Sequence, residues 1–360
     1  MLIYESPGMA TLSAMTTMTN TYRAVQLRGK GGLDQLVEVK LPLVDPAAGE
    51  IRIRVTATGV GFTDITMRTG YYPYRPAFPF VPGYEVVGEV DAIGAGVTGV
   101  VLGQRVCALT VHGGYAERLT REAEHFVAVP DGVDDADTVA LVLNYVTAYQ
   151  MIHRSAAMKP GQTALVTGAN GGVGMALVEL LGLAKVRVIA ACSERHFAHM
   201  QALGAVPIPS RGRPLDVLVH ELEADGVDAA FDGLGGPATR ECVRATRKGG
   251  TVVAYGFMAA RVAGRPSTWA TLRGFASLAV GGRLAGRRPV FYGITQIYRK
   301  DPTSLREDLP KLLELLRTGQ VHPKIAARLP LLAGARAQAV LERGAVIGKI
   351  VLVRDGADAS

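Results

Sequence analysis

Hydrophobic and polar residues alternate along this chain with two different periods, and the change comes near Pro160. Before Pro160, short segments such as residues 50–58 alternate every second residue, which is the period of a half-buried β-strand. Gly and Pro separate these segments, as is typical of an irregular β-barrel. After Pro160, apolar runs alternate with helical segments, which predicts a parallel doubly wound sheet. The sequence therefore predicts an α/β protein built from these two units.

The expected elements follow from these periods. In the first unit we expect strands over residues 22–27, 36–39, 50–58, 84–93, 104–108, 113–119 and 125–129. A short helical turn is expected around residues 64–68, and a helix over 135–146 with Asp134 or Asp135 as its N-cap. In the second unit the expected strands are 163–167, 186–191, 206–207, 227–231 and 250–255, and the expected helices are 175–184, 196–203, 215–222 and 238–246. A helix over 309–318, with Pro310 in its first turn, precedes a final strand, helix and strand at 326–332, 335–343 and 349–353.

A glycine-rich turn separates the expected strand 163–167 from the expected helix 175–184. The turn reads GANGGVG and consists of Gly168, Ala169, Asn170, Gly171, Gly172, Val173 and Gly174. Glycine lets the backbone turn sharply and approach a diphosphate closely, and free N–H groups at a helix start favour an anion. A tight turn without a ligand is the alternative interpretation. In its strand–turn–helix context the turn predicts dinucleotide binding.

Composition and charge indicate which classes of protein and which partners fit this chain. The chain has 360 residues, of which 48% are hydrophobic and 20% charged, which indicates a globular protein of two domains. The net charge is +7, but residues 259–300 hold eight basic residues and no acid. The rest of the chain carries 31 basic and 32 acidic residues, so we expect no nucleic-acid partner. The basic segment is either a solvated surface or a surface that attracts an anionic ligand or an acidic membrane.

The first residues of the chain and its cysteines indicate in which compartment of the cell we expect the protein. The first 20 residues carry no Lys or Arg, and we expect them to form a flexible tail rather than a secretory or transit signal. No apolar run approaches the roughly 20 residues that span a bilayer. The three cysteines, Cys107, Cys192 and Cys242, are far apart in the sequence. They fit a reducing cytoplasm better than a disulfide framework.

Nine stretches in order resemble the medium-chain dehydrogenase/reductase superfamily, in particular its zinc-independent, quinone oxidoreductase-like (zeta-crystallin-type) branch. They are FTDITMRTGYYP, PFVPGYEVVGEV, GVTGVVLGQRV, GGYAE, VTAY, GANGGVG, VDAAFDGLGG, GGTVVAYG and GKIVL. The resemblance runs from about residue 22 to the C-terminus. It implies a GroES-like barrel domain over 21–146 and 297–360, and a Rossmann domain over 147–296. It also implies an active site between the two domains and a homodimer.

The resemblance also bears on metal binding. Zinc-containing members of the superfamily have a Cys where this chain has Phe62 and a His where it has Tyr84. Phe cannot ligate a metal, and a phenol without His or Cys companions is a poor zinc ligand. We therefore expect no metal. Glu85, which follows Tyr84, is expected to act as a structural hydrogen-bond acceptor.

The residues at the end of the second strand of the doubly wound unit predict which nucleotide is bound. An NAD site usually has an acid at this position, but here it is Cys192. Ser193 and Arg195 follow and can hydrogen-bond and neutralise a 2′-phosphate. Glu194 would repel that phosphate if it pointed inward. We predict NADPH as the cofactor, with Arg211 replacing a tyrosine that many relatives have near this place.

Further cofactor contacts are implied by family positions. Asp232 ends a strand at the edge where open α/β sheets bind ligands. Lys349 is expected to reach a phosphate from the substrate domain. The resemblance implies four more residues that contact the cofactor. They are Thr147, Tyr255, Gly256 and Phe257.

A tyrosine is the candidate catalytic residue, because the cofactor supplies the hydride and the protein must supply a proton. Tyr72, in GYYP, resembles the proton donor of related enoyl reductases, with Tyr71 and Tyr74 as alternatives. The simpler interpretation is that these rings only pack in a Pro-rich loop. Asp64 fits a family position but is at least as well explained as a structural cap. The expected substrate pocket comprises Phe62, Asp64, Tyr71, Tyr84 and Tyr145.

These observations predict an NADPH-dependent oxidoreductase that passes hydride to a quinone or an α,β-unsaturated carbonyl compound without a metal. A polyketide or fatty enoyl reductase is the nearest alternative. A different class also stays open, because the family includes proteins resembling vesicle amine transport protein that act on membranes or lipids. The basic segment 259–300 is the feature that would serve such a role.

Overall fold

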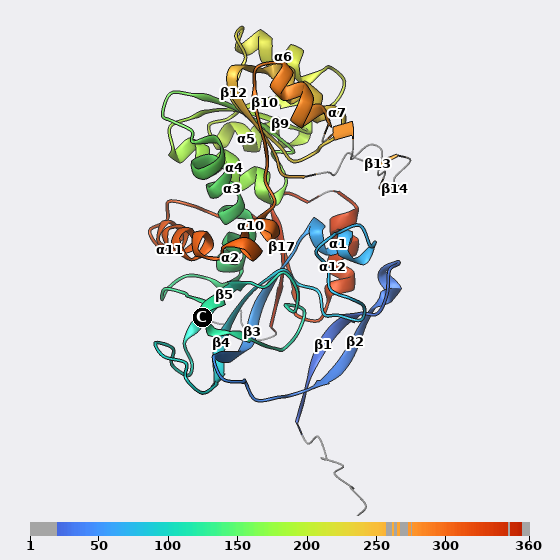
Figure 1. The fold of residues 1–360 in the computed structure, drawn as a ribbon, viewed down its shortest axis with the longest axis vertical. Coiled ribbons are helices and arrows are strands. Elements are labelled where there is room, and N and C mark those ends of the chain that lie inside the picture. Colours follow the sequence, from blue (N-terminus) through green and yellow to red (C-terminus); the bar gives the residue numbers. More distant parts are fainter. Residues whose placement is uncertain are drawn as a thin grey trace, which may run out of the picture.

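A computed structural model describes residues 20–256, 261–262, 265–266, 273–274, 276–344 and 346–354. The expected tail therefore lies outside the described residues except for Asn20, and so does Phe257. Two sheets organise the rest, one in the upper and one in the lower half of Figure 1. With the helices that surround them, the two sheets give the chain the α/β fold class that the sequence predicts.

The lower sheet takes strands from both ends of the chain. The N-terminal strands are β1 (Thr21–Leu27), β2 (Leu36–Pro42), β3 (Glu50–Val60), β4 (Glu85–Ile93), β5 (Arg105–Leu109), β6 (Arg118–Glu122) and β7 (Val127–Ala128). Strands β1 and β2 form a separate antiparallel pair. The seven-stranded sheet has the order β16-β17-β3-β4-β5-β7, and β6 also pairs with β3. It is completed by β16 (Ile325–Pro330) and β17 (Lys349–Val353), of which β17 lies antiparallel to β3.

A long helical stretch leads from the lower half to the upper half. It comprises α2 (Asp135–Ala140), η3 (Leu141–Tyr145), α3 (Val146–Gln150) and η4 (Met151–Ala156). Asp134 is its N-cap, because Oδ1 of Asp134 accepts from the backbone N of Ala136 at 2.8 Å and of Asp137 at 3.0 Å. The stretch ends at Ala157, which has φ 51°. It is therefore longer than the helix that the sequence predicts.

The upper sheet has six parallel strands in the order β10-β9-β8-β11-β12-β15. The strands are β8 (Thr163–Thr167), β9 (Arg187–Cys192), β10 (Val206–Pro209), β11 (Val227–Asp232), β12 (Thr246–Ala254) and β15 (Arg288–Phe291). The helices are α4 (Gly172–Leu183), α5 (Phe197–Ala202), α6 (Leu215–Leu222) and α7 (Pro237–Ala245). Strand order reverses between β8 and β11, where such sheets bind ligands beyond the carboxyl ends of their strands.

Burial on both faces explains why the middle of strand β8 is apolar at every position. In β8, Ala164 and Val166 pack into the core that contains α4, whereas Leu165 packs into the core that contains α6 and α7. A strand covered on both faces favours apolar side chains at consecutive positions. The continuous apolar run of β8 follows from this arrangement.

The C-terminal region contains the clearest difference from the sequence prediction. Its elements are α10 (Ile294–Lys300), α11 (Thr303–Arg317) and α12 (Gly334–Glu342). Helix α11 begins at Thr303, so the expected start near residue 309 was wrong, and Pro310 lies inside the helix rather than in its first turn. Pro310 is exposed, so water can satisfy the carbonyl that its missing N–H leaves free.

The remaining differences are smaller. The strand expected at 113–119 is β6, which begins at Arg118, and the strand expected at 125–129 shortens to β7. Helix α1 (Phe62–Arg68) confirms the short helical turn predicted over 64–68. Short elements that the sequence did not predict are β13 (Arg261–Val262), β14 (Arg265–Pro266), η6 (Ser277–Gly281), α9 (Gly282–Leu284), the strand β15 and the helix α10. None of the helices in the described residues is long and apolar enough to cross a membrane.

Candidate functional site

The glycine turn joins β8 to α4 at the carboxyl edge of the parallel sheet. Gly168 has φ 62°, a conformation that favours glycine. Helix α4 begins at Gly172, and no side chain caps it. The N–H groups of a first helical turn have no partner within the helix, so those of Gly172, Val173 and Gly174 can bind an anion.

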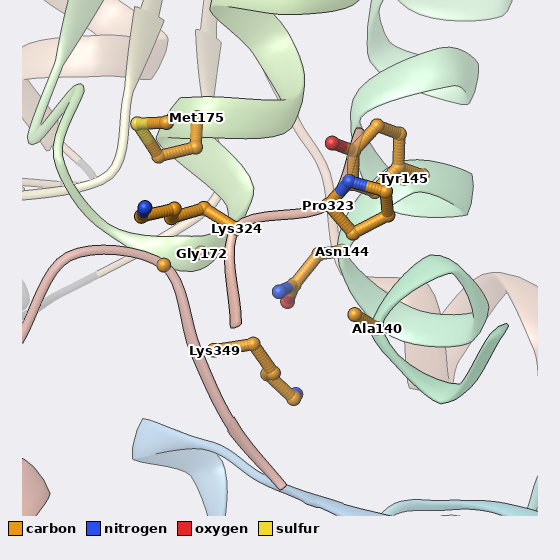
Figure 2. A pocket seen from close by; sticks show the side chains of 9 residues that line it. Ala140, Asn144, Tyr145, Gly172, Met175, Pro323, Lys324 and Lys349 are labelled. Atoms are coloured by element: carbon orange, nitrogen blue, oxygen red, sulfur yellow. The ribbon is translucent and has the colours of Figure 1, made fainter. Parts of the chain in front are cut away.

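Close packing also requires glycine within the turn. A Cβ on Gly174 would lie 2.3 Å from the carbonyl oxygen of Gly168, and a Cβ on Gly172 would lie 2.4 Å from Nδ2 of Asn144. Figure 2 shows Asn144 extending from the neighbouring helix toward Gly172, with Lys349 below them in this view. The turn is thus shaped by its neighbours as well as by its own sequence.

Tyr145 packs beside the glycine turn. It lines a cavity of about 10 Å³, roughly the space of one water, together with Asn144, Gly172 and Met175 (Figure 2). Its hydroxyl donates to Oε2 of Glu179, and burial together with that carboxylate raises the pKa of Tyr145. Tyr145 therefore does not join Tyr72 and Tyr84, whose hydroxyl groups bond to each other as described below.

Asp232 shapes the turn that follows β11. Its carboxylate is fully buried and accepts from Thr167 Oγ1 at 3.0 Å, from the backbone N of Leu234 at 3.0 Å and of Gly235 at 3.1 Å, and from Thr239 Oγ1 at 2.6 Å. The donors of these four hydrogen bonds to the carboxylate are all groups of the protein itself. Asp232 thus positions the turn at the cofactor edge.

The residues after β12 contact this turn directly. The backbone N of Tyr255 donates to the carbonyl of Asp232 at 2.9 Å. A Cβ on Gly256 would lie 2.2 Å from the carbonyl oxygen of Gly233, so only glycine allows the two loops to come this close. Thr147 is buried on α3. Phe257, expected beside these residues, lies outside the described part of the chain.

The residues predicted to recognise the 2′-phosphate lie beyond the carboxyl ends of two neighbouring strands, Ser193 and Arg195 after β9 and Arg211 after β10. Ser193, Arg195 and Arg211 are all exposed. Arg195 donates through Nη2 to the carbonyl of Gly344 at 3.2 Å. Glu194 is exposed as well. Two guanidinium groups and a hydroxyl are thus open to solvent next to the strand end where the ribose of a dinucleotide lies in this type of fold.

Asp64 acts as a cap inside the lower half. It is fully buried, its Oδ2 accepts from the backbone N of Gly61 at 2.8 Å, and its Oδ1 accepts from the backbone N of Gly83 at 3.1 Å. The first bond closes the N-terminus of α1. Burial raises the pKa of Asp64, and the two backbone bonds oppose that rise. These contacts favour the structural interpretation of Asp64.

Glu85 and Lys349 form a buried ion pair. Lys349 is 4% exposed and its Nζ contacts Oε1 of Glu85, which is fully buried. Oε2 of Glu85 accepts from the backbone N of Leu143 at 2.6 Å. The residue before Lys349, Gly348, donates its N–H to the carbonyl of Asn170 at 3.3 Å. The ammonium that we expected at a phosphate is therefore engaged with Glu85, close to the glycine turn.

Three hydroxyl groups meet around Tyr72. Tyr72 Oη lies 2.8 Å from Tyr84 Oη and 2.5 Å from Oγ1 of Thr295. The rings of Tyr72 and Tyr84 pack edge to face with their centroids 6.3 Å apart. Tyr71 lies apart from them, because its side chain is 48% exposed and its ring lies beneath Nζ of Lys30.

Two further aromatic residues flank this group. Tyr74 packs its ring 5.8 Å from that of Tyr72, and its own ring lies beneath the guanidinium of Arg299. Phe62 is the first residue of α1 and is partly buried. Sequence reasoning missed Thr295, because a lone Thr inside a helix carries no motif and only the fold brings it to Tyr72.

Comparison with known proteins assigns the family. Residues 47–131 match the alcohol dehydrogenase GroES-like domain, and residues 203–352 match the family described as zinc-binding dehydrogenase. The chain is also 30% identical over 349 residues to the synaptic vesicle membrane protein VAT-1 homolog of Danio rerio, covering 94% of this chain and 71% of that protein. The chain belongs to the medium-chain dehydrogenase/reductase family. This confirms the predicted family, and with it a GroES-like domain joined to a Rossmann-type sheet.

Other members of the medium-chain dehydrogenase/reductase family are known as enzymes. A 2-haloacrylate reductase from Burkholderia is 29% identical, covering 92% of this chain and 98% of the enzyme. A mycobacterial quinone oxidoreductase has a solved structure with a TM-score of 0.77 and 28% identity, covering 92% of this chain and 99% of that one. A mycobacterial structure in complex with NADPH has a TM-score of 0.79 and 27% identity over the same shares. The chain is thus similar to oxidoreductases across both domains.

The zinc in the family description does not fit the residues of this member. Phe62 and Tyr84 occupy the positions where zinc-containing relatives are expected to have metal ligands. The nearby carboxylates of Asp64 and Glu85 are engaged by backbone N–H groups and by Lys349. Among the described residues, no group of three or more His, Cys, Asp and Glu side chains is arranged to hold a metal ion. We derive no catalytic step through zinc.

Proposed function

We propose that this oxidoreductase uses NADPH to reduce a quinone or an α,β-unsaturated carbonyl compound, with Tyr72 as the proton donor. One observation carries the proposal: three contacts, joined by residues adjacent in sequence, lead from the glycine turn to the tyrosines. Gly348 bonds to Asn170 of the turn, the adjacent Lys349 pairs with Glu85, and Glu85 follows Tyr84, which bonds to Tyr72. A dinucleotide on the turn would therefore end close to Tyr72.

The described residues fit a dinucleotide that carries a 2′-phosphate in addition to its diphosphate. The uncapped start of α4 offers N–H groups to the diphosphate. Ser193, Arg195 and Arg211 would hold the 2′-phosphate, because guanidinium groups match phosphate oxygens. The mycobacterial relative solved with NADPH supports this choice.

Tyr72 fits the role of a general acid. NADPH, when bound, supplies the hydride. Burial raises the pKa of Tyr72, so its hydroxyl holds its proton at neutral pH. The proton can then pass from Tyr72 Oη to the reduced acceptor, which is the task of a general acid in such a reduction. Relatives named as a 2-haloacrylate reductase and a quinone oxidoreductase support acceptors with conjugated double bonds.

Stopped-flow oxidation of NADPH tests the proposal. The purified protein is mixed with NADPH and with each member of a panel of quinones, enones and enoyl thioesters. We expect rapid NADPH oxidation with at least one quinone or enone and slower oxidation of NADH. A preference for enoyl thioesters of long chains would point instead to the fatty or polyketide enoyl reductase. Turnover with no acceptor would contradict both enzymatic proposals.

A membrane-associated role is the second candidate, because the chain is 30% identical to a synaptic vesicle membrane protein homolog. The basic segment 259–300, only partly within the described residues, would attract anionic lipid. Pelleting with liposomes of phosphatidylserine and phosphatidylcholine, in low and in high salt, tests this. Binding that is lost in high salt would support it, and no binding at low salt would exclude it.

We also propose a homodimer that forms through the edge of the upper sheet at strand β15. Among the described residues β15 is the last strand of that sheet, and Leu284 and Phe291 near it are 84% and 43% exposed. An exposed strand edge with apolar neighbours favours pairing with a second copy. Light scattering after size exclusion should give about twice the chain mass of 38.0 kDa. The mass of a single chain would contradict the dimer.

The cysteines favour a cytoplasmic location, which we propose. Cys107, Cys192 and Cys242 are all buried and unpaired with one another. Burial raises the pKa of Cys107 to about 12, so its thiol stays protonated and unreactive. Fractionation of cells that express the chain should place it with cytoplasmic markers.

A further inference from the structure

The proton donor is flanked by two hydroxyl groups that come from different parts of the chain. Tyr84 precedes β4, and Thr295 lies in the first turn of α10, directly after the last strand of the parallel sheet. Both are 1% exposed, whereas Tyr72 is partly exposed. The distances to Tyr72 Oη, 2.8 Å from Tyr84 Oη and 2.5 Å from Thr295 Oγ1, are those of hydrogen bonds.

The number of protons and lone pairs decides how these hydroxyls can bond. A tyrosine hydroxyl carries one proton and can also accept, and a threonine hydroxyl carries one proton and two lone pairs. Two neighbours that each donate to Tyr72 Oη leave the proton of Tyr72 free for a third group. Two neighbours that accept cannot both be served, because Tyr72 has a single proton.

The surroundings of Tyr84 keep its hydroxyl protonated. Burial raises the pKa of Tyr84 well above its usual value, and Tyr72 together with the carboxylates of Asp64 and Glu85 raises it further. An ionised Tyr84 would be a buried anion close to two carboxylates, which is strongly unfavourable. Thr295 does not ionise and can donate at any pH. Both neighbours of Tyr72 are therefore available as donors throughout the reaction.

We propose that Thr295 and Tyr84 are positioning residues that donate hydrogen bonds to Tyr72 Oη, direct its proton toward the acceptor, and stabilise the phenolate that remains after the proton leaves. The inference rests on the proposed reductase function. It adds two residues from opposite domains to the proton-donating group. Because Thr295 follows the parallel sheet, the donor is complete only when the two domains are in contact.

The step balances as follows. The acceptor gains two electrons with the hydride and then a proton, as the O–H bond of Tyr72 breaks and a new bond to hydrogen forms on the acceptor. Water returns a proton to the phenolate after the product leaves. Tyr84 and Thr295 are both buried, so neither leads from Tyr72 to solvent, and their role is to hold charge rather than to conduct protons. Burial raises the pKa of Tyr72, and hydrogen bonds from Thr295 and Tyr84 oppose this rise.

Replacing Thr295 by Val and by Ser separates the hydroxyl from the shape of the side chain. Thr295→Val keeps the shape and removes the donor, whereas Thr295→Ser keeps the donor. We expect Thr295→Val to lower kcat for enone reduction by about tenfold to a hundredfold, because hydrogen bonds to a charged group have this worth. The loss of activity at alkaline pH, where Tyr72 ionises, should move to higher pH. Thr295→Ser should behave like the wild type, and NADPH affinity should be equal in both variants.

A second measurement does not depend on turnover. In protein labelled at the tyrosine Cζ carbons, NMR follows the ionisation of Tyr72, whose signal is assigned from the Tyr72→Phe variant. We expect the Tyr72 signal to titrate at higher pH in Thr295→Val and in Tyr84→Phe than in Thr295→Ser. Equal curves for Val and Ser at position 295 would overturn the inference, as would equal kcat values for these two variants. If the wild type reduces no acceptor, the proposed function fails, while the NMR comparison still decides whether Thr295 and Tyr84 stabilise the phenolate.

Discussion

At the scale of single residues, chemistry depends on which polar groups have partners inside the protein. Asp232 and Asp64 both occupy positions that suggest catalysis or ligand binding, yet their oxygens accept bonds from the protein itself. Tyr72 differs, because its neighbours are hydroxyls and its side chain is partly exposed. This contrast makes Tyr72 the strongest candidate for contact with the acceptor.

Replacing Tyr72 by Phe tests this contrast. The variant keeps the ring and its edge-to-face packing on Tyr84 and removes the proton. We expect enone reduction to fall by about a hundredfold or more, in the usual range for a general acid, with little change in NADPH affinity. The matched control is Tyr71→Phe, because Tyr71 is exposed and its ring packs against Lys30, and it should retain full activity. Equal rates for wild type and Tyr72→Phe, measured by steady-state kinetics, would remove Tyr72 from the mechanism.

Arg195 allows a separate test of the nucleotide. The Arg195→Ala variant loses a guanidinium that we expect at the 2′-phosphate, so the Kd for NADPH should rise about tenfold to a hundredfold. The Kd for NADH should change little. Arg213→Ala is the control, because this exposed side chain pairs with Glu221. Fluorescence titration with both nucleotides provides the measurement, and an equal effect on the two Kd values would contradict the assignment.

At the scale of elements, the start of α4 determines whether the turn can receive a phosphate. The turn needs glycine at Gly168 for its positive φ and at Gly174 for close approach to the strand end. The same helix contains Gly182, where an added Cβ would meet nothing within 4 Å. One glycine is therefore required by packing and another is replaceable on the same element.

Replacing these two glycines by Ala gives opposite expectations. Gly174→Ala places a Cβ 2.3 Å from a backbone oxygen, so the turn must shift, and NADPH binding should weaken severely. Gly182→Ala fills open space in a helix and should stabilise the protein by about 0.5–1 kcal/mol without affecting binding. Calorimetric titration with NADPH and urea unfolding measure the two effects. Unchanged NADPH affinity in Gly174→Ala would contradict the proposed phosphate site.

At the scale of the whole molecule, the C-terminal strand links the two halves. Strand β17 pairs with β3 of the lower sheet (Figure 1), and the residue before it, Gly348, bonds to the glycine turn of the upper sheet. The buried pair of Lys349 and Glu85 lies at this junction. A change at Lys349 should therefore affect the stability of the folded chain.

Lys349→Met should destabilise the protein by about 3–5 kcal/mol near neutral pH, because it leaves the Glu85 carboxylate buried without its cation. Burial already raises the pKa of Glu85 above its usual 4.5, and Lys349 opposes this rise. Without Lys349 the folded state favours protonated Glu85, so the variant should lose stability as pH rises above 4.5. Adding Glu85→Gln should recover part of the loss.

Urea unfolding between pH 4 and pH 8 provides this measurement. Lys311→Met is the control, because the ammonium of Lys311 is mostly exposed in its pair with Asp308. It should cost about 1 kcal/mol or less, with little dependence on pH. A pH-independent loss in Lys349→Met would contradict the role of the Glu85 pair.

The sequence by itself determined the class of fold, the family, the glycine turn and most elements of the parallel sheet. It could do so because strands buried on both faces and glycines in tight turns leave strong local patterns, as in residues 163–174. An acidic residue before an apolar periodic segment predicted Asp134 or Asp135 as a helix cap, and the structure shows that Asp134 is the one. Helix α11 was harder, because its first turns are polar and are fixed by tertiary contacts such as that of Asp308 with Arg154.

Only the tertiary structure decided how the site is assembled. In the folded chain Lys349 pairs with Glu85, and Tyr145 bonds to Glu179. Tyr71 is exposed, whereas Thr295 bonds to Tyr72. Thr295 and Tyr72 are 223 residues apart in the chain. Contacts over such separations depend on how the two sheets meet, and local periodicity carries no information about them. The sequence therefore specified the parts of this protein, and packing between its halves specified which side chains can act together.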